Sequence, residues 1–92
     1  MSVEQYQRAV NRLEGELADL EKKQADLLKK ESTSMSKINS IEKSISKNTS
    51  VNTLISKQKE IQRHSNDVAK YAKERSDISS KISNKRKSLA DN

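Results

Sequence analysis

The chain of 92 residues contains no cysteine, proline, tryptophan or phenylalanine, and it has one glycine and two tyrosines. The lack of cysteine excludes disulfide bonds, thiol chemistry and zinc–thiolate sites. A single glycine excludes a glycine-rich phosphate-binding loop. Only 30% of the residues are hydrophobic, too few for a compact core of this length to offset the loss of chain entropy. The remaining options are disorder or long helices that bury a narrow stripe.

Long hydrophobic runs are also missing. No apolar stretch approaches the roughly 18 residues that a transmembrane helix needs, and the N-terminus lacks the basic and apolar segments of a signal peptide. We therefore expect a cytoplasmic protein. The only histidine, His64, is flanked by Glu60 and Asp67 at helical spacing, but such spacing is common by chance in so charged a chain, and a metal site would need further His or Cys residues or clustered carboxylates. We expect no cofactor, no metal and no catalytic residue, and hence no enzyme activity.

A heptad repeat runs through the first half of the chain. From Tyr6 to Ile45, alternating steps of four and three residues pass through twelve positions, of which nine are apolar. The residues between them are mostly good helix formers. This pattern predicts one helix over about residues 3–46, with helix-pairing positions at Val10, Leu13, Leu17, Leu20, Leu27, Ile38, Ile41 and Ile45.

A second heptad repeat follows from Leu54 to Leu89. Its steps alternate between three and four residues, and seven of its eleven positions are apolar. It predicts a second helix over about residues 51–90. Its helix-pairing positions are Leu54, Ile61, Val68, Tyr71, Ile78, Ile82 and Leu89.

The segment between the repeats, residues 46–53, is rich in Ser, Asn and Thr, whose side chains compete for backbone hydrogen bonds and favour turns. Ser50 is a good N-cap for the second helix. We therefore expect a loop over about residues 46–50 that includes Asn48, Thr49 and the cap Ser50. Because such a short loop makes the helices antiparallel neighbours, it favours a hairpin. The alternative is one continuous helix in a long parallel dimer.

The fold class that follows is all-α, an antiparallel two-helix coiled-coil hairpin. If Ile45 faces Leu54, the register places Gln24 opposite Arg75 and Glu31 opposite Val68. It also brings Ser34 opposite His64, Ile41 opposite Lys57 and Leu13 opposite Lys85. Apolar residues beside the repeats widen the stripe and suggest that the hairpin dimerises into a four-helix bundle: Leu28, Met35, Ile55 and Ala72.

The charge of the chain is uneven. Residues 1–31 carry a net charge of −1 and residues 32–92 a net charge of +7. A basic half can bind nucleic acid, but the basic residues are interspersed with Asp and Glu, and both tyrosines lie in the heptad repeats. We therefore interpret the charges as a solvated coiled-coil surface and disfavour a nucleic-acid partner. A membrane-surface partner is disfavoured too, because the second helix lacks bulky Trp or Phe.

Residues 40–57, SIEKSISKNTSVNTLISK, resemble the N-terminal helical region of bacterial TIR-domain proteins. In that family a pattern like S-I-[SG]-K-[TN]-T-S-P-S-T-L-x-[ST]-K joins two helices rich in Lys, Ser and Ile. Here residues 44–50, Thr53, Leu54 and Lys57 match it, and Val51 stands where the pattern has proline. The resemblance covers about residues 36–90.

The resemblance implies that the chain is the oligomerising segment of a longer protein, whose C-terminal TIR domain would cleave NAD using a glutamate. None of that domain's motifs occurs here, so no catalytic residue is carried over. The leading interpretation is a non-catalytic scaffold that binds itself, most simply as a dimer, and raises the local concentration of TIR domains. The alternative is a stand-alone helical hairpin of a secreted or chaperone type that binds another protein.

Overall fold

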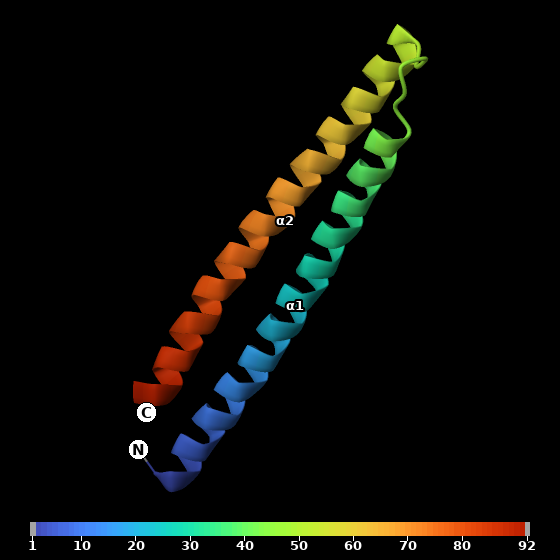
Figure 1. Cartoon of the computed structure of the whole chain (residues 1–92). Helices are drawn as coiled ribbons and strands as arrows, with labels where there is room; N and C mark the ends of the chain where they lie inside the picture. The colour runs from blue at the N-terminus through green and yellow to red at the C-terminus, as the bar shows by residue number, and fades with distance from the viewer. Residues whose placement is uncertain (1, 92) are drawn as a thin grey trace.

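Two long helices make up the fold of the computed structural model, which describes residues 2–91. Helix α1 spans Val3–Lys43 and helix α2 spans Val51–Asp91. They lie side by side in opposite directions, with both chain ends at one end of the rod and the loop at the other (Figure 1). The rod measures 73 × 14 × 14 Å between its Cα extremes. The predicted all-α antiparallel hairpin is therefore confirmed, and the continuous helix is wrong.

Helix α1 begins with a capping box. The amide of Gln5 donates to Ser2 Oγ at 3.1 Å, and the Ser2 amide donates to Gln5 Oε1 at 3.2 Å. Each bond satisfies a backbone N–H near the start of the helix. Glu4 adds a negative charge in the first turn, where it interacts favourably with the helix dipole.

Helix α1 ends at Lys43, three residues before the predicted end at residue 46. Ser44 Oγ donates to the Ile41 carbonyl at 2.5 Å, a local bond that competes with helix continuation. From α2, Lys57 Nζ donates to the Ser44 carbonyl at 3.1 Å and to Ser44 Oγ at 2.7 Å. A lysine on the terminal carbonyls of a helix stabilises its end. Ile45, which the heptad repeat placed inside the helix, lies half-buried in the loop.

The loop is held by its own hydroxyl groups. The Ser46 amide donates to Thr49 Oγ1 at 2.8 Å, and the Thr49 amide donates to the Ser46 carbonyl at 3.1 Å. Asn48 donates from its amide to Ser46 Oγ at 3.3 Å. Ser50 Oγ then accepts the Thr53 amide at 3.2 Å and acts as the N-cap of α2. The turn thus forms these hydrogen bonds without proline or glycine.

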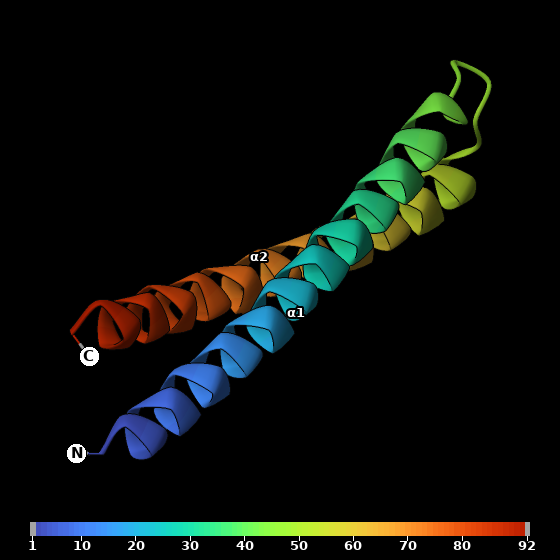
Figure 2. The same ribbon diagram turned by 90° about the horizontal axis from the view of Figure 1, so that it is seen from below.

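The helices cross at a shallow angle rather than running exactly alongside. Figure 2 shows that they separate toward the chain ends. Side chains near this end are accessible to solvent. The exposed fraction is 84% for Val3 and 38% for Tyr6. The buried apolar side chains lie farther along the rod, from Leu13 to Leu27 on α1 and at Ile82 on α2.

Candidate interaction surface

The surface on which α1 and α2 pair contains the apolar heptad positions of both helices. Four of its residues are buried, with exposed fractions between 6 and 9%: Leu13, Leu17, Leu27 and Ile82. The other apolar positions are half-buried: Val10, Leu20, Ile38, Ile41, Ile45, Leu54, Ile61, Val68, Tyr71, Ile78 and Leu89. Within residues 2–91 no side chain is less than 2% exposed. A single partner helix therefore leaves much of each stripe open to solvent. Of the loop positions, Thr49 is half-buried, and Asn48 and Ser50 are exposed.

A polar cluster interrupts this surface near its middle. Glu31 and Ser34 are buried, with exposed fractions of 8 and 7%. Arg75 donates to Glu31 from Nε at 3.0 Å and from Nη2 at 3.4 Å. Nearby, Gln24 Nε2 donates to Ser79 Oγ at 2.7 Å. Buried charges cost free energy unless they are paired, so this cluster fixes how the two helices align.

These hydrogen bonds are offset from the predicted opposing pairs. Arg75 hydrogen-bonds Glu31, whereas the register places Gln24 opposite it. Similarly, Lys57 hydrogen-bonds Ser44, whereas the register places Ile41 opposite it. Helical side chains tilt toward the N-terminus of their own helix. For α2 that direction leads to the loop, so its long polar side chains reach residues farther along α1 than the backbone register places them.

Ion pairs near the chain ends also link the helices. Lys85 Nζ contacts Glu16 Oε2, where the sequence register had placed Leu13 opposite this lysine. Arg86 Nη2 lies 3.0 Å from Glu21 Oε1. The hydrogen bond from Lys85, together with its positive charge, holds the pKa of Glu16 below its usual value. Both pairs are solvent-exposed, so each contributes little free energy by itself.

One side of the hairpin, which we call the charged face, is lined by ionisable residues of both helices. Lys30 and Asp67 line one groove there with a volume of about 280 Å³, and Lys30 Nζ lies 6.0 Å from the ring centroid of Tyr71. Lysines of α1 thus lie opposite acidic residues of α2, which suits antiparallel pairing. The charged face consists of Glu16, Asp19, Lys23, Asp26, Lys30, Lys37, Glu60, Arg63, Asp67, Lys70, Glu74, Asp77 and Lys81.

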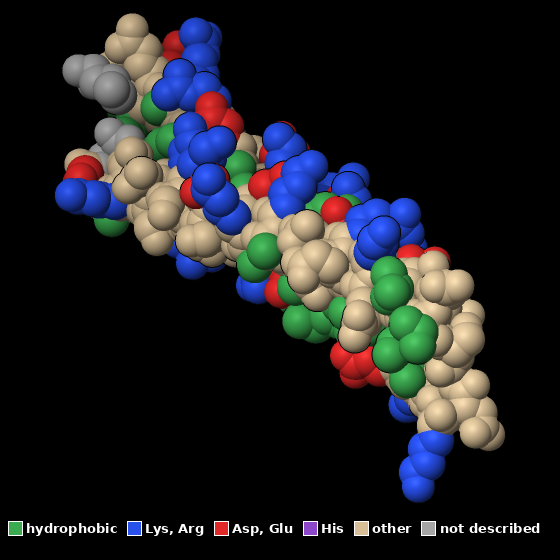
Figure 3. Space-filling model, turned by 90° about the horizontal axis from the view of Figure 1, so that it is seen from above, with side chains coloured by type: hydrophobic (Ala, Val, Ile, Leu, Met, Phe, Trp, Pro, Cys, Tyr) green, Lys and Arg blue, Asp and Glu red, His purple; other side chains and the backbone are tan. Residues whose placement is uncertain are grey.

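The opposite side, which we call the uncharged face, carries no ionisable residue over most of its length. Leu28, Met35 and Ile55 are its large apolar side chains, and 51, 48 and 45% of their surfaces are exposed. Its other members are small or polar. Figure 3 shows lysines and arginines gathered along one ridge beside a band of hydrophobic and uncharged side chains. The uncharged face consists of Ala25, Leu28, Ser32, Met35, Asn39, Ile55, Gln58, Gln62, Ser65, Ala69, Ala72, Ser76, Ser79 and Ser83.

Sequence reasoning missed this division into two faces. The signal is present in the sequence. Beside the heptad positions of α2 runs a second stripe, from Ile55 to Ser83 at alternating steps of three and four residues, and every residue in it is uncharged. Most of these residues are Ser, Ala or Gln, which give no hydrophobic periodicity. The stripe is therefore visible only as an absence of charge.

Within residues 2–91, no group of three or more His, Cys, Asp or Glu side chains is arranged to hold a metal ion. Over the same residues, neither helix has a stretch that is long and apolar enough to cross a membrane. No family model, curated protein or solved structure matches the chain. The geometry of the two faces is thus the basis for a functional proposal.

Proposed function

We propose that this chain is a non-catalytic helical-hairpin module that binds a second copy of itself. The observation that carries the proposal is the uncharged face, where Leu28, Met35 and Ile55 remain about half-exposed although the hairpin is fully formed. Large apolar side chains that stay exposed along one uncharged side of a protein mark an interaction surface. Because the chain has a net charge of +6, two copies approach with least repulsion through a face that carries no charge.

The incomplete burial of the pairing surface supports this proposal. Most apolar heptad positions are only half-buried between α1 and α2, and a four-helix bundle would cover the stripe from a second side. Burial of apolar surface contributes about 25 cal/mol per Å². Association of two hairpins would therefore stabilise each hairpin as well as join the copies.

In the sequence-based interpretation, such a module would bring together TIR domains of a bacterial protein. The support for this part is the sequence resemblance of residues 40–57 alone. Pairing would raise the effective concentration of any attached domain. In this proposal the module works in the cytoplasm. Disulfide bonds are rare there, so the absence of cysteine from the chain is compatible with that location.

A second candidate function is binding to a helix of a different protein. The same face favours it, because an amphipathic helix can occupy an apolar strip between two helices. The two functions differ in what the isolated chain does. A hetero-binding hairpin stays monomeric by itself, whereas a self-binding module assembles.

The mass of the chain in solution tests the proposal. Light scattering after size exclusion, over a range of concentrations, should give a discrete multiple of the 10.4 kDa chain mass. A helical monomer at every concentration would remove self-association and leave the hetero-binding function. Titration with duplex DNA at two salt concentrations tests the disfavoured nucleic-acid partner, for which binding should fall steeply with salt.

A further inference from the structure

The two halves of the uncharged face differ in side-chain size. The half on α1 presents Leu28 and Met35, both about half-exposed. The half on α2 presents Ser65, Ala69 and Ala72 at its centre. Close-packed surfaces place large side chains against small ones. This difference restricts how two identical faces can fit together, and the inference below rests on the proposed self-association.

Two copies can join their uncharged faces by a two-fold axis in two ways. If the axis runs along the rod, α1 of each copy packs on α2 of the other, and all chain ends lie together. If the axis runs across the rod, α1 packs on α1 and α2 on α2, and the chain ends lie at opposite ends. The two arrangements make different contacts.

Side-chain size favours the axis along the rod. Within one hairpin, Lys30 lies over Tyr71, so Leu28 and Ala72 lie at nearly the same height. With the axis along the rod, Leu28 of one copy meets Ala72 of the other, and Met35 meets Ser65. With the axis across the rod, Leu28 meets Met35 while Ala69 meets its own counterpart. That arrangement crowds one helix pair and leaves the other pair underfilled.

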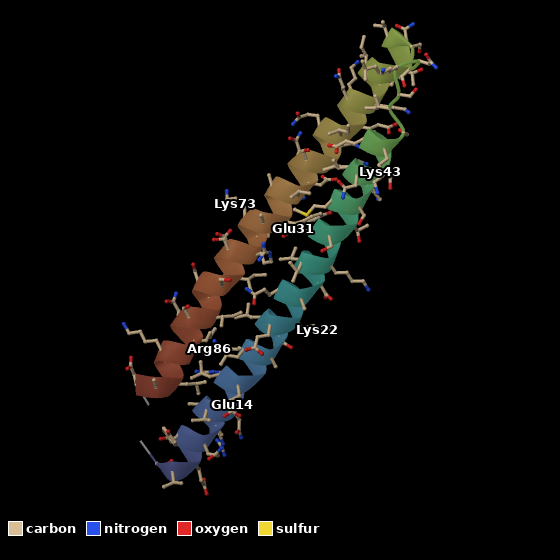
Figure 4. All side chains as sticks on the ribbon, viewed as in Figure 1. Glu14, Lys22, Glu31, Lys43, Lys73 and Arg86 are labelled. Carbon is tan, nitrogen blue, oxygen red and sulfur yellow. The ribbon has the colours of Figure 1, made fainter. Side chains whose placement is uncertain are left out.

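Charge at the two ends of the face favours the same arrangement. The α1 half ends in Glu21 toward the chain ends and in Glu42 toward the loop. On α2, Arg86 pairs with Glu21 within one hairpin. Figure 4 shows Arg86 near the terminal end of the rod, on the same stretch as Glu14. With the axis along the rod, Glu21 of one copy lies toward Arg86 of the other, whereas the axis across the rod brings Glu42 near Glu21.

The area is adequate for a dimer. Residues 55–83 of α2 cover about 42 Å at 1.5 Å per residue. With the 14 Å width of the rod, the flat area is roughly 600 Å² per copy, compared with about 800 Å² per partner in a standard stable interface. An interface of this size gives an association that depends on concentration.

We propose that two copies pack through their uncharged faces with the two-fold axis along the rod. The product is a four-helix bundle in which α1 of each copy contacts α2 of the other. All four chain ends then lie at one end of the bundle. Domains fused there would be held side by side.

Cysteine cross-linking tests this arrangement cleanly, because the chain has no cysteine of its own. Ser32 and Ala69 lie exposed at the centre of the two halves of the face. A Ser32→Cys chain is mixed with an Ala69→Cys chain that carries a mass tag, and the mixture is oxidised. We expect the disulfide-linked product to contain one chain of each kind. Products containing two identical chains would establish the axis across the rod and overturn the proposal.

A matched pair on the same side of the hairpin as the charged face, Thr33 and Lys70, serves as the control. Thr33 and Lys70 are exposed at similar heights, and the mixed Thr33→Cys and Lys70→Cys chains should not cross-link. In parallel, Leu28→Glu should weaken the dimer at least tenfold, whereas Thr33→Glu should leave it unchanged. Circular dichroism confirms that each variant remains helical.

The outcomes separate the two proposals. A wild-type dimer that persists in Leu28→Glu, or that cross-links through Thr33 and Lys70, overturns the assigned face but leaves self-association intact. A wild-type chain that is monomeric at every concentration overturns both. A dimer with only mixed Ser32–Ala69 products supports both.

Discussion

Arg75 of α2 reaches across the hairpin to both carboxylate oxygens of Glu31 on α1, and the carboxylate is nearly enclosed. The side chain of Glu31 is 11% exposed and that of Arg75 is 35% exposed. Figure 4 shows Glu31 between the two helices, whereas Lys73, on the outside of α2, points away from them. The pair occupies a position where a heptad repeat normally carries an apolar side chain. Glu31 therefore helps to align the two helices. Because it stands in the place of an apolar side chain, it also reduces the apolar surface that the helices bury against each other.

Removing the carboxylate should destabilise the hairpin. We expect Glu31→Ala to lower the free energy of unfolding by about 2 kcal/mol, because it leaves Arg75 without its partner. The expected loss is below the range for a fully buried pair since Arg75 keeps access to water. Urea unfolding followed by circular dichroism measures it, with Glu14→Ala, on an exposed site of the same helix, as the control. A loss as small as that of the control would show that the pair contributes nothing.

Replacing both members of this pair should not lower the stability of the hairpin as removing one of them does. Replacing both partners by leucine should be neutral or stabilising, because the apolar stripe becomes continuous and no charge is left unpaired. A double-mutant cycle with Glu31→Leu and Arg75→Leu measures the coupling. If the change in the free energy of unfolding in the double variant equalled the sum of the changes in the two single variants, the two side chains would not interact.

Gly15→Ala should stabilise the hairpin. Gly15 lies within α1, and a Cβ atom added there would meet no other atom within 4 Å. Glycine in a helix interior costs about 1 kcal/mol relative to alanine, so the free energy of unfolding should rise by about that amount. The midpoint of thermal unfolding should rise accordingly. A decrease would mean that this site approaches another chain closely in the assembled form, which a measurement at low protein concentration would separate.

Ser50→Ala should weaken the start of α2. Ser50 Oγ accepts the Thr53 amide at 3.2 Å, and loss of an N-cap typically costs about 1 kcal/mol. Chemical denaturation provides the measurement. Ser80→Ala, on the exposed surface in the middle of α2, is the matched control and should be neutral or slightly stabilising because alanine has the higher helix propensity. Equal losses in both variants would mean that Ser50 is not a cap.

Acid should weaken the contact between Glu16 and Lys85. Because this contact lowers the pKa of Glu16 in the folded chain, its stabilisation is present above the pKa of an unfolded glutamate, about 4.3, and is lost as the pH falls through the folded value. The midpoint of thermal unfolding should therefore decrease on acidification below about pH 4. In Glu16→Gln the decrease should be smaller. An unchanged pH profile in this variant would show that the contact does not form in solution.

The sequence predicts the hairpin because two signals agree. The heptad repeats define the helices, and the run of Ser, Asn and Thr with a break in phase defines the turn. It does not predict the end of α1 at Lys43, because Ile45 continues the apolar pattern while Ser44 forms local hydrogen bonds. The pair between Arg75 and Glu31 is also missed, since it depends on the direction of side chains along the helix rather than on their spacing.

The uncharged face illustrates a different limit. A pattern search weighted by hydrophobicity detects Leu28, Met35 and Ile55 individually but ignores the Ser and Ala residues between them. Their shared side becomes evident once the pairing of the helices fixes which residues point away from it. A search for missing charge at helical spacing would have found the stripe from Ile55 to Ser83.

The placement of both chain ends at one end of a thin rod has a mechanical consequence (Figure 1). A force that pulls the two chain ends apart acts perpendicular to the helix axes. It therefore breaks the contacts between the helices one after another, starting at the chain ends. The helices already separate at that end (Figure 2), and no side chain within residues 2–91 is completely enclosed. Opening should therefore proceed at low force from the chain ends toward the loop, with the buried side chains of Leu13, Leu17 and Ile82 as the first point of increased resistance.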